Sequence, residues 1–180
     1  MKPLEIVKIG HPVLRQKGVS VSTGQLAQEE FQNFLDQMIE TMHAAEGVGL
    51  AANQVGQGVQ AIVLECKRNG RYPDRPEVPL ETYVNPKIVH YSPAKEDDWE
   101  GCLSIPGYRG KVARSFEVTF EALTREGKFV RKIVNGFHAR IIQHEVDHIN
   151  GMFYMDKMKD LQSWMHLDEF NRFSGLSVTE

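Results

Sequence analysis

The chain contains 180 residues, of which 41% are hydrophobic and 25% are charged, and it carries a formal net charge of −3. This length predicts a single domain over residues 1–180 with one hydrophobic core, and the mixed charges argue against nucleic acid as the main ligand. The amino terminus has no apolar run of signal-peptide length, and nowhere do about 18 apolar residues follow one another, so we expect a cytoplasmic protein with no membrane partner.

The amino-terminal half predicts one long helix and one buried strand. Residues 25–45 place apolar side chains at helical spacing, with acidic residues near the amino end. Residues 59–66 are rich in branched side chains and predict a strand that ends at Cys66, whose thiol we expect to pack in the core. Residues 67–80 carry charges and three prolines without periodicity, which is typical of an exposed insertion loop.

The next segments predict strands and turns. Residues 83–91 look extended, although Pro86 interrupts them, and the acidic residues 96–98 predict a turn. Two further runs, 111–123 and 128–134, predict a β-hairpin that leads the chain into a helix.

The helix after this hairpin contains the sequence His-Glu-x-x-His. Residues four apart share one face of a helix, so His144 and His148 offer two imidazoles to one ion. Neutral imidazole suits zinc or ferrous iron. Glu145 lies about 80° further round the helix, beside the ion, where it is placed to move protons.

The rest of this helix is expected to be mostly buried. Asn135 or Gly136 would cap it, and Gly151 would end it. Apolar residues cover two of its sides, and one apolar stripe runs through Phe137 and Ile141 into the two histidines. Such a stripe could line a pocket beside the metal.

A narrow polar strip remains on this helix, formed by Arg140, Gln143, Asp147 and Asn150. A carboxylate on a buried helix needs a partner, and we expect Arg114 on the preceding hairpin to pair with Asp147. From about residue 156 onward, apolar residues again recur at helical spacing and predict a surface helix with a frayed tail.

Two imidazoles do not complete a tetrahedral site, and the third ligand decides the class of protein. A metzincin would need a histidine six residues after His148, where Tyr154 stands, so that class is excluded. A thermolysin-like zinc peptidase would use a downstream carboxylate, for which Glu169 is the candidate. The thiol of Cys102 is the other candidate. A peptide-binding module without catalysis is a further alternative, although the presence of Glu145 argues against it.

Residues 47–56 are rich in glycine and alanine, so another backbone can approach them closely. A tight connection between a helix and a strand would have the same composition. Gln54 stands near the end of this run, and its amide can donate a hydrogen bond to a developing oxyanion.

Three segments of the chain together resemble the signature motifs of peptide deformylase, in that family's order. They are Gly47-Val48-Gly49-Leu50-Ala51-Ala52-Asn53-Gln54, Glu100-Gly101-Cys102-Leu103-Ser104 and Gln143-His144-Glu145-Val146-Asp147-His148. The resemblance implies an α+β fold in which antiparallel β-sheets pack around a central helix that carries the metal motif. It also implies a single catalytic domain that removes the N-formyl group from the initiator methionine of nascent chains in bacteria or organelles.

The resemblance also implies roles for individual residues. The implied metal ligands are Cys102, His144 and His148. The implied catalytic groups are Glu145 as general base and Gln54 with the Leu103 backbone N–H as oxyanion donors. The implied substrate-binding residues are Val48, Phe137 and Ile141 around the methionine side chain, and Gly49, Gly101 and Arg109 along the peptide.

The chain departs from the family pattern at Asp98, because this position is commonly apolar and belongs to the methionine pocket. We expect one divalent metal ion per chain, with ferrous iron in the cell and zinc, nickel or cobalt as substitutes, since a thiolate ligand blunts a purely Lewis-acidic ion. The expected partners are N-formylmethionyl nascent peptides, with at most transient ribosome contact because the carboxyl-terminal tail is not basic.

Overall fold

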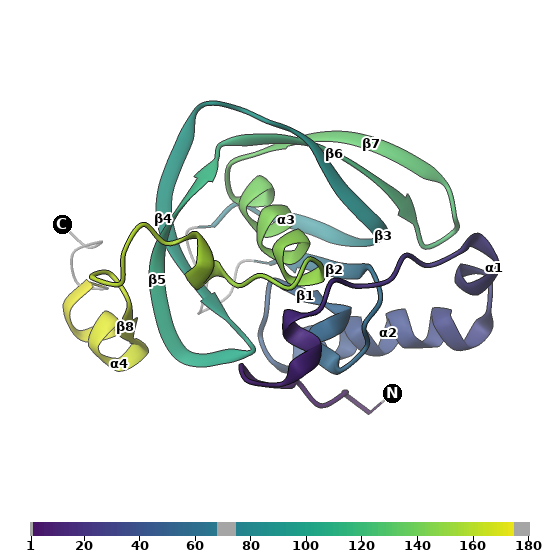
Figure 1. Ribbon diagram of the computed structural model, residues 1–180, viewed down its shortest axis with the longest axis horizontal. Coiled ribbons are helices and arrows are strands. Elements are labelled where there is room, and N and C mark those ends of the chain that lie inside the picture. The colour runs from purple at the N-terminus through teal and green to yellow at the C-terminus, as the bar shows by residue number, and fades with distance from the viewer. Residues whose placement is uncertain (1, 68–74, 175–180) are drawn as a thin grey trace.

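The computed structural model describes residues 2–67 and 75–174, and the strands within these ranges form two antiparallel sheets (Figure 1). The large sheet has the strand order β1-β2-β3-β6-β7, and the small sheet has the order β4-β5-β8. The strands are β1 (Gly49–Ala51), β2 (Ala61–Cys66), β3 (Val78–Tyr91), β4 (Lys95–Cys102), β5 (Ile105–Ser115), β6 (Glu117–Thr124), β7 (Phe129–Asn135) and β8 (Met165–His166). The helices are α1 (Thr23–Leu26), α2 (Glu29–Ala44), α3 (Gly136–Ile149) and α4 (Leu167–Glu169). The predicted α+β class with antiparallel sheets is confirmed.

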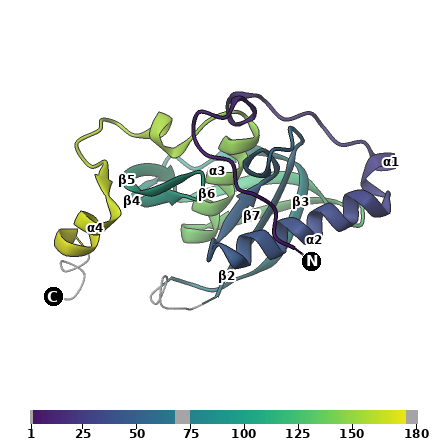
Figure 2. The same ribbon diagram turned by 90° about the horizontal axis from the view of Figure 1, so that it is seen from below.

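Helix α3 lies between the two sheets and packs against strands of both (Figure 1). It contacts all strands of the large sheet on one side and β5 of the small sheet on the other. Helix α2 packs against β1 and β2 and runs along the large sheet (Figure 2). The chain therefore has its longest helices on the large sheet, and one of them also faces the small sheet.

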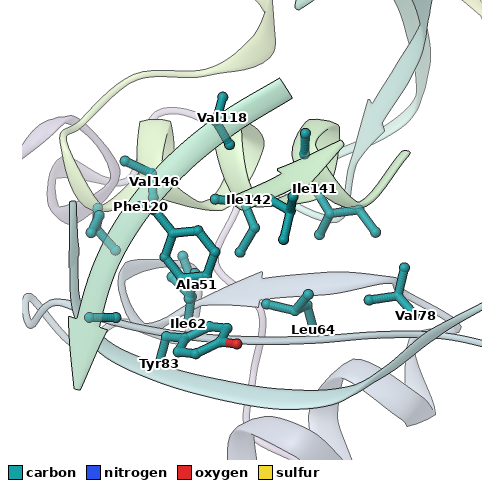
Figure 3. Close-up of a cluster of buried hydrophobic side chains, with 14 of the residues drawn as sticks. Ala51, Ile62, Leu64, Val78, Tyr83, Val118, Phe120, Ile141, Ile142 and Val146 are labelled. Atoms are coloured by element: carbon teal, nitrogen blue, oxygen red, sulfur yellow. The ribbon is translucent and has the colours of Figure 1, made fainter. Parts of the chain in front are cut away.

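Strand β2 divides the hydrophobic core, because successive side chains of a strand point to opposite faces. Ile62 and Leu64 pack in the cluster beneath α3, whereas Ala61 and Val63 pack in the cluster beneath α2. We call the first cluster the α3 core (Figure 3); its buried members are Ala51, Ile62, Leu64, Cys66, Val78, Tyr83, Val118, Phe120, Ala122, Val134, Ala139, Ile141, Ile142, Val146 and Ile149. The prediction that Cys66 packs in the core is confirmed.

The predicted helix over 25–45 is two helices in the structure. Ser22 and Gln25 form a capping box that starts the short α1, which ends at Leu26. Gln28 then has an extended backbone, with ψ of 136°, and α2 begins at Glu29. The apolar spacing alone does not reveal this break, since Leu26 of α1 and Leu35 of α2 pack in the same hydrophobic cluster.

The predicted interruption at Pro86 and the predicted turn at residues 96–98 both lie inside strands. Strand β3 continues through Pro86, where its pairing with β6 shifts register between Val84 and Lys87. The missing N–H of proline therefore falls at an irregularity of the ladder, where proline is tolerated. The acidic residues 96–98 belong to β4 rather than to a turn.

The predicted strand over 111–123 is two strands in different sheets. Strand β5 ends at Ser115, Phe116 follows, and β6 begins at Glu117. The chain thus crosses from the small sheet to the large one at Phe116. The hairpin itself is confirmed, because β6 pairs with β7 over the second predicted run.

Two further predictions need correction. Of the expected insertion loop 67–80, residues 68–74 lie outside the described residues, and residues 78–80 belong to β3. The predicted long helix beyond residue 156 is wrong, because among residues 158–174 the helical segments are α4 and a short π-helical turn, Phe170–Ser174. Apolar residues of this segment, such as Met158 and Trp164, pack against a small cluster around Ile105 instead. Across the described ranges, no helix has the length and apolar character needed to cross a membrane.

Candidate metal centre and active site

The start and the end of α3 determine the position of its last turn, which carries His148. The helix begins after Asn135, which has an extended backbone, and ends at Ile149. Gly151 then takes a left-handed conformation, with φ of 76°, that turns the chain away. A Cβ at this position would lie 2.6 Å from the Arg15 carbonyl oxygen, so only glycine fits. This tight contact sets the position of the turn that carries His148.

Cys102, at the end of β4, lies against the two histidines of α3. Its Sγ is 3.2 Å from His148 Nε2, and the ligand atoms of Cys102, His144 and His148 all lie within 4.8 Å of one another. The two imidazole rings are 4.9 Å apart. The pairing of β4 with β5 shifts register between Gly101 and Cys102, and such irregularities commonly re-aim a side chain. The structure thus brings together three side chains that can hold one metal ion.

Glu100 joins His144 to two arginines. Its Oε2 lies 2.9 Å from His144 Nδ1, and it accepts hydrogen bonds from Arg114 Nε and Nη2 at 2.9 and 3.0 Å and from Arg140 Nη1 at 2.8 Å. Burial alone would raise the pKa of Glu100, but the charge and hydrogen bonds of Arg114 and the hydrogen bond from His144 hold it far below its usual range. A carboxylate at Nδ1 makes that nitrogen the donor, so Nε2 of His144 is the nitrogen left for a metal.

The predicted ion pair between Arg114 and Asp147 is confirmed. Because Arg114 also binds Glu100, this one guanidinium connects β4, β5 and α3. The polar strip of α3 faces the small sheet, where the Gln143 amide exchanges hydrogen bonds with the backbone of Ser115 at 3.1 and 2.9 Å. We call Glu100, Arg114, Arg140, Gln143 and Asp147 the buried polar network.

Glu145 lies next to β1, apart from the buried polar network. The residue is 3% exposed, and among the described residues its Oε2 has no hydrogen-bond partner. Burial raises the pKa of the Glu145 carboxyl to about 7, against the opposing effect of His144. A Cβ at Gly49 would overlap this carboxylate, so the glycine makes room for it. A carboxylate with a free oxygen in such a position can accept and return a proton near neutral pH.

Gln54 lies in the 3-10 turn Ala52–Val55, directly after β1. Its Oε1 accepts a hydrogen bond from the Ala51 N–H at 2.9 Å, which leaves Nε2 directed at Cys102 Sγ and Ser104 Oγ at 3.4 and 3.3 Å. The neighbouring Asn53 donates to the His148 carbonyl. The glycine-rich and alanine-rich run therefore forms β1 and a 3-10 turn, and this turn points one amide donor at the cysteine.

The residues expected around the methionine side chain differ in exposure. Val48 and Phe137 are partly buried and pack against the α3 core, whereas Ile141 is 3% exposed and lies within it. Asp98 forms an ion pair with Arg75, whose guanidinium lies 4.9 Å from the centre of the Phe137 ring. Burial would raise the pKa of Asp98, but the hydrogen bond and charge of Arg75 lower it. The unusual acidic residue is thus paired with a cation that lies over the Phe137 ring.

Gly101 and Arg109 line a cavity of about 240 Å³ beside Cys102 and Leu103. We call it the cysteine cavity; its lining residues are Ile6, Lys8, Ala45, Gly101, Cys102, Leu103, Ile105, Pro106, Gly107, Tyr108, Arg109 and Leu167. Gly49 is not in this lining; it lies against the Glu145 carboxylate.

The thermolysin-like alternative is not favoured by the geometry. Glu169 lies on α4, where its carboxylate pairs with Arg172 at 3.2 Å, and it is not a member of the cluster that joins Cys102 to the histidines. The sequence patterns predict no role for Glu100 or Arg140 in the site, although both residues hold His144 and its surroundings in place. For Glu100 a signal existed, since residues two apart on a strand share a face and Glu100 precedes Cys102 by two.

Comparison with known proteins agrees with this geometry. Residues 3–164 match the family model described as polypeptide deformylase. The chain is 38% identical to peptide deformylase 2 of Pseudomonas putida and 37% identical to peptide deformylase 1 of Nitrosomonas europaea, with 98% and 97% of each pair of chains covered.

Solved structures show the same relationship. A class I type b peptide deformylase from Acinetobacter baumannii, with Met-Ala-Ser bound, superposes with a TM-score of 0.85 and 38% identity over 87% of this chain and 99% of that one. A peptide deformylase from Thermotoga maritima superposes with a TM-score of 0.77 and 31% identity over 89% of this chain and 100% of that one. From its sequence and its fold alike, the chain belongs to the polypeptide deformylase family.

Proposed function

We propose that this protein is a metal-dependent hydrolase that removes the N-formyl group from formyl-methionyl peptides and releases formate and a methionyl peptide. The observation that carries the proposal is the convergence of one thiol and two imidazoles beside a buried carboxylate with a free oxygen. Membership of the deformylase family supports the same reaction, as does the related enzyme from Acinetobacter baumannii that was solved with Met-Ala-Ser, a product-like peptide.

In this proposal the His-Glu-x-x-His segment of α3 is the metal motif, and Cys102, His144 and His148 hold one divalent ion. The residues fit such an ion, because their ligand atoms lie within 4.8 Å of one another and a thiolate with two imidazoles is a common donor set for zinc and iron. When bound, the ion would activate a water molecule as nucleophile and polarise the formyl carbonyl.

The side chains around the ligands supply the remaining chemistry. Glu145 takes the proton of the attacking water and returns it to the departing amine. The Gln54 amide and the Leu103 backbone N–H donate hydrogen bonds to the oxygen that becomes negatively charged after attack, which stabilises the transition state more than the substrate. The position of Gln54 Nε2, 3.4 Å from Cys102 Sγ, supports this role.

The peptide is proposed to bind between the edges of the two sheets. Strand β1 is an edge of the large sheet and begins at Gly49, beside Glu145, whereas β4 is an edge of the small sheet and ends at Cys102. Gly49 and Gly101 would let the peptide backbone approach these edges, and Val48, Phe137 and Ile141 would surround the methionine side chain. The whole chain would act as one catalytic domain, with at most transient contact to the ribosome.

The central experiment measures hydrolysis of formyl-Met-Ala-Ser together with metal content. The reconstituted protein should hydrolyse the peptide with one ion per chain, and Cys102→Ala should lose tight metal binding. Glu145→Gln should keep the metal but lose at least about a hundredfold in turnover. Glu169→Ala, the control for the alternative ligand, should keep both. One equivalent of metal in Cys102→Ala, or appreciable turnover in Glu145→Gln, would overturn the assignment.

The identity of the ion is a separate part of the proposal, and we propose ferrous iron in the cell. A thiolate beside ferrous iron is exposed to oxygen, which can oxidise Cys102 to sulfenic and sulfinic acid. The apoprotein should be reconstituted anaerobically with each ion and then assayed with and without air. The iron form should be more active than the zinc form and decay in air, whereas nickel or cobalt forms should persist. Equal, air-stable rates for iron and zinc would exclude this choice.

A further inference from the structure

The 3-10 turn Ala52–Val55 follows β1 and packs against α3, and it lies outside the strands of both sheets. All four of its residues are buried. Two backbone hydrogen bonds anchor it, since the Val7 N–H donates to the Gln54 carbonyl at 2.9 Å and the Gln57 N–H donates to the Ala52 carbonyl at 3.0 Å. This turn is therefore a fixed support next to the candidate ligands.

Two neighbouring side chains of this turn reach two different candidate ligands. Gln54 directs its amide nitrogen at Cys102. Asn53 is fully buried, and its Nδ2 donates a hydrogen bond to the backbone carbonyl of His148, 95 positions further along the chain. A carbonyl can only accept, so the amide nitrogen must face it and the amide oxygen Oδ1 stays available. The Asn53 side chain thus lies against the turn that carries His148, with one acceptor unused.

His148 has one nitrogen on the ligand side and one nitrogen without an acceptor. The residue is fully buried, its Nε2 lies 3.2 Å from Cys102 Sγ, and among the described residues its Nδ1 has no hydrogen-bond partner. A neutral imidazole that binds a metal through Nε2 carries its proton on Nδ1, and metal-bound histidines almost always donate this proton to an acceptor. His144 has such an acceptor in Glu100, at 2.9 Å. His148 needs one of its own.

Three buried side-chain oxygens lack a hydrogen-bond partner in the described part of the chain, namely Asn53 Oδ1, Tyr83 Oη and Glu145 Oε2. The Tyr83 ring lies in the α3 core, and the Glu145 carboxylate is the proposed proton carrier. Of the three residues, Asn53 is the one whose side chain is hydrogen-bonded to His148. Its oxygen is therefore the best candidate for the acceptor that the imidazole needs.

We propose that Asn53 is a positioning residue for the metal ligand His148. Its Nδ2 holds the last turn of α3 through the His148 carbonyl, and its Oδ1 accepts the His148 Nδ1–H when Nε2 holds the ion. The inference rests on the proposed function, because it takes the metal site as given. A buried amide suits this role, since it supplies a donor and an acceptor in one rigid plane. Asn53 would thus do for His148 what Glu100 does for His144.

The test compares Asn53→Asp with Asn53→Leu, two substitutions of similar volume that both remove the donor to the His148 carbonyl. Asn53→Asp keeps an oxygen for the Nδ1–H, whereas Asn53→Leu does not. Competition with a chelator for Co²⁺ or Zn²⁺ measures metal affinity without turnover. Asn53→Leu should bind the ion about 10-fold to 100-fold more weakly than wild type, and Asn53→Asp should bind it at least about fivefold more tightly than Asn53→Leu. Equal affinities in the two variants would overturn the role of Oδ1.

Asn150 provides matched controls, because its Nδ2 donates to the Val146 carbonyl at 2.7 Å near the same end of α3. Asn150→Leu removes that hydrogen bond, and Asn150→Asp places the same added charge near the ligands. Neither should change metal affinity by more than about threefold. If Asn150→Asp raises the affinity as much as Asn53→Asp does over Asn53→Leu, charge rather than the Oδ1 contact explains the result and the inference fails.

A double-mutant cycle with His148→Ala separates positioning from a general loss of stability. Asn53→Leu should weaken Co²⁺ binding in the wild-type background but change it by less than about twofold in the His148→Ala background, where only Cys102 and His144 remain as ligands. Should Asn53→Leu fail to fold, Asn53→Ala removes both polar atoms without adding bulk and takes its place in the cycle. If the wild-type protein binds no metal and does not hydrolyse formyl-Met-Ala-Ser, the proposed function fails. If it does both, but Asn53→Leu weakens metal binding equally in the two backgrounds, the role of Asn53 is refuted while the proposed function stands.

Discussion

Helix α3 meets the large sheet and the small sheet through different chemistry. Toward the large sheet it buries Ile142 and Val146 in the α3 core, whose members are apolar side chains (Figure 3). Toward the small sheet it buries the polar network around Glu100 and Arg114. Apolar burial is non-directional and supplies stability, whereas a buried ion network adds little net stability but fixes atoms at hydrogen-bond distance. We therefore expect the large sheet to hold the fold and the small sheet to align the ligands.

The largest expected effect on stability comes from the α3 core. Phe120 on β6 is fully buried and packs edge-on against the Tyr83 ring at 5.0 Å. Phe120→Ala should lower the free energy of unfolding by about 3–5 kcal/mol because it leaves a cavity, while activity per folded molecule stays near wild type. Urea titrations and assays at low temperature measure both, with Phe129→Ala, 60% exposed, as the control. A large loss of intrinsic activity would mean that the large sheet also aligns the site.

A substitution at Glu100 tests the expectation that the small sheet aligns the candidate ligands. Glu100→Gln removes the charge that binds Arg114 and Arg140 and the carboxylate that orients His144, so it should destabilise the fold by about 3 kcal/mol and weaken metal binding by about 10-fold to 100-fold. Competition with a chelator measures the affinity, and Glu96→Gln, exposed on the same strand, is the control. If Glu100→Gln is less stable but binds the metal as tightly as wild type, the small sheet does not align the candidate ligands.

The parts of the candidate site differ in how well the sequence predicts them. The position of His144, Glu145 and His148 follows from helical periodicity, which is local, so it could be predicted directly. The pair of Arg114 and Asp147 could be predicted as well, because a carboxylate on a buried helix needs a cation. The position of Cys102 against the histidines depended on resemblance to a family, since 42 or more residues separate it from them in the chain.

The features that the sequence does not predict are those that depend on which of the two sheets a segment joins. The alternation of side chains is the same in both sheets, so nothing local shows that the chain changes sheets at Phe116. The helical spacing of the apolar residues after Lys157 predicts a helix, but most of this segment is irregular and packs against residues of the small sheet such as Ile105. The partners of Glu100 were missed because Arg140 and His144 lie 40 and 44 residues away.

Asp147 separates stability from alignment within the polar network, because its carboxylate pairs with Arg114 and, among the described residues, has no hydrogen bond or ion pair with a candidate ligand side chain. Asp147→Asn should lower the free energy of unfolding by about 2 kcal/mol, since it leaves the Arg114 charge partly uncompensated, and should change metal affinity by less than about threefold. Asp97→Asn, exposed on β4, is the matched control. Thermal unfolding and the same chelator competition give the two numbers, and an unaltered melting temperature would contradict the expectation.

The smallest expected effect concerns an ion cluster on the large sheet, where Glu81 accepts hydrogen bonds from Lys132 at 2.7 Å and His138 at 2.9 Å. Burial would raise the pKa of Glu81, but these hydrogen bonds lower it to about 2. Because the folded pKa lies below the ordinary value of 4.5, the carboxylate stabilises the fold above about pH 4.5, and this contribution is lost as the pH falls toward 2.

Glu81→Gln should therefore reduce the free energy of unfolding by about 1–2 kcal/mol at pH 6, and the difference from wild type should vanish between about pH 4 and pH 2. Glu121→Gln, which removes a more exposed pair with Arg131, should cost less than about 0.5 kcal/mol. Urea titrations across this range decide the matter. A difference that stays constant from pH 6 to pH 3 would show that packing around Glu81, rather than its charge, stabilises this side of the large sheet. In that case charged groups would contribute to the contact of α3 with the small sheet alone.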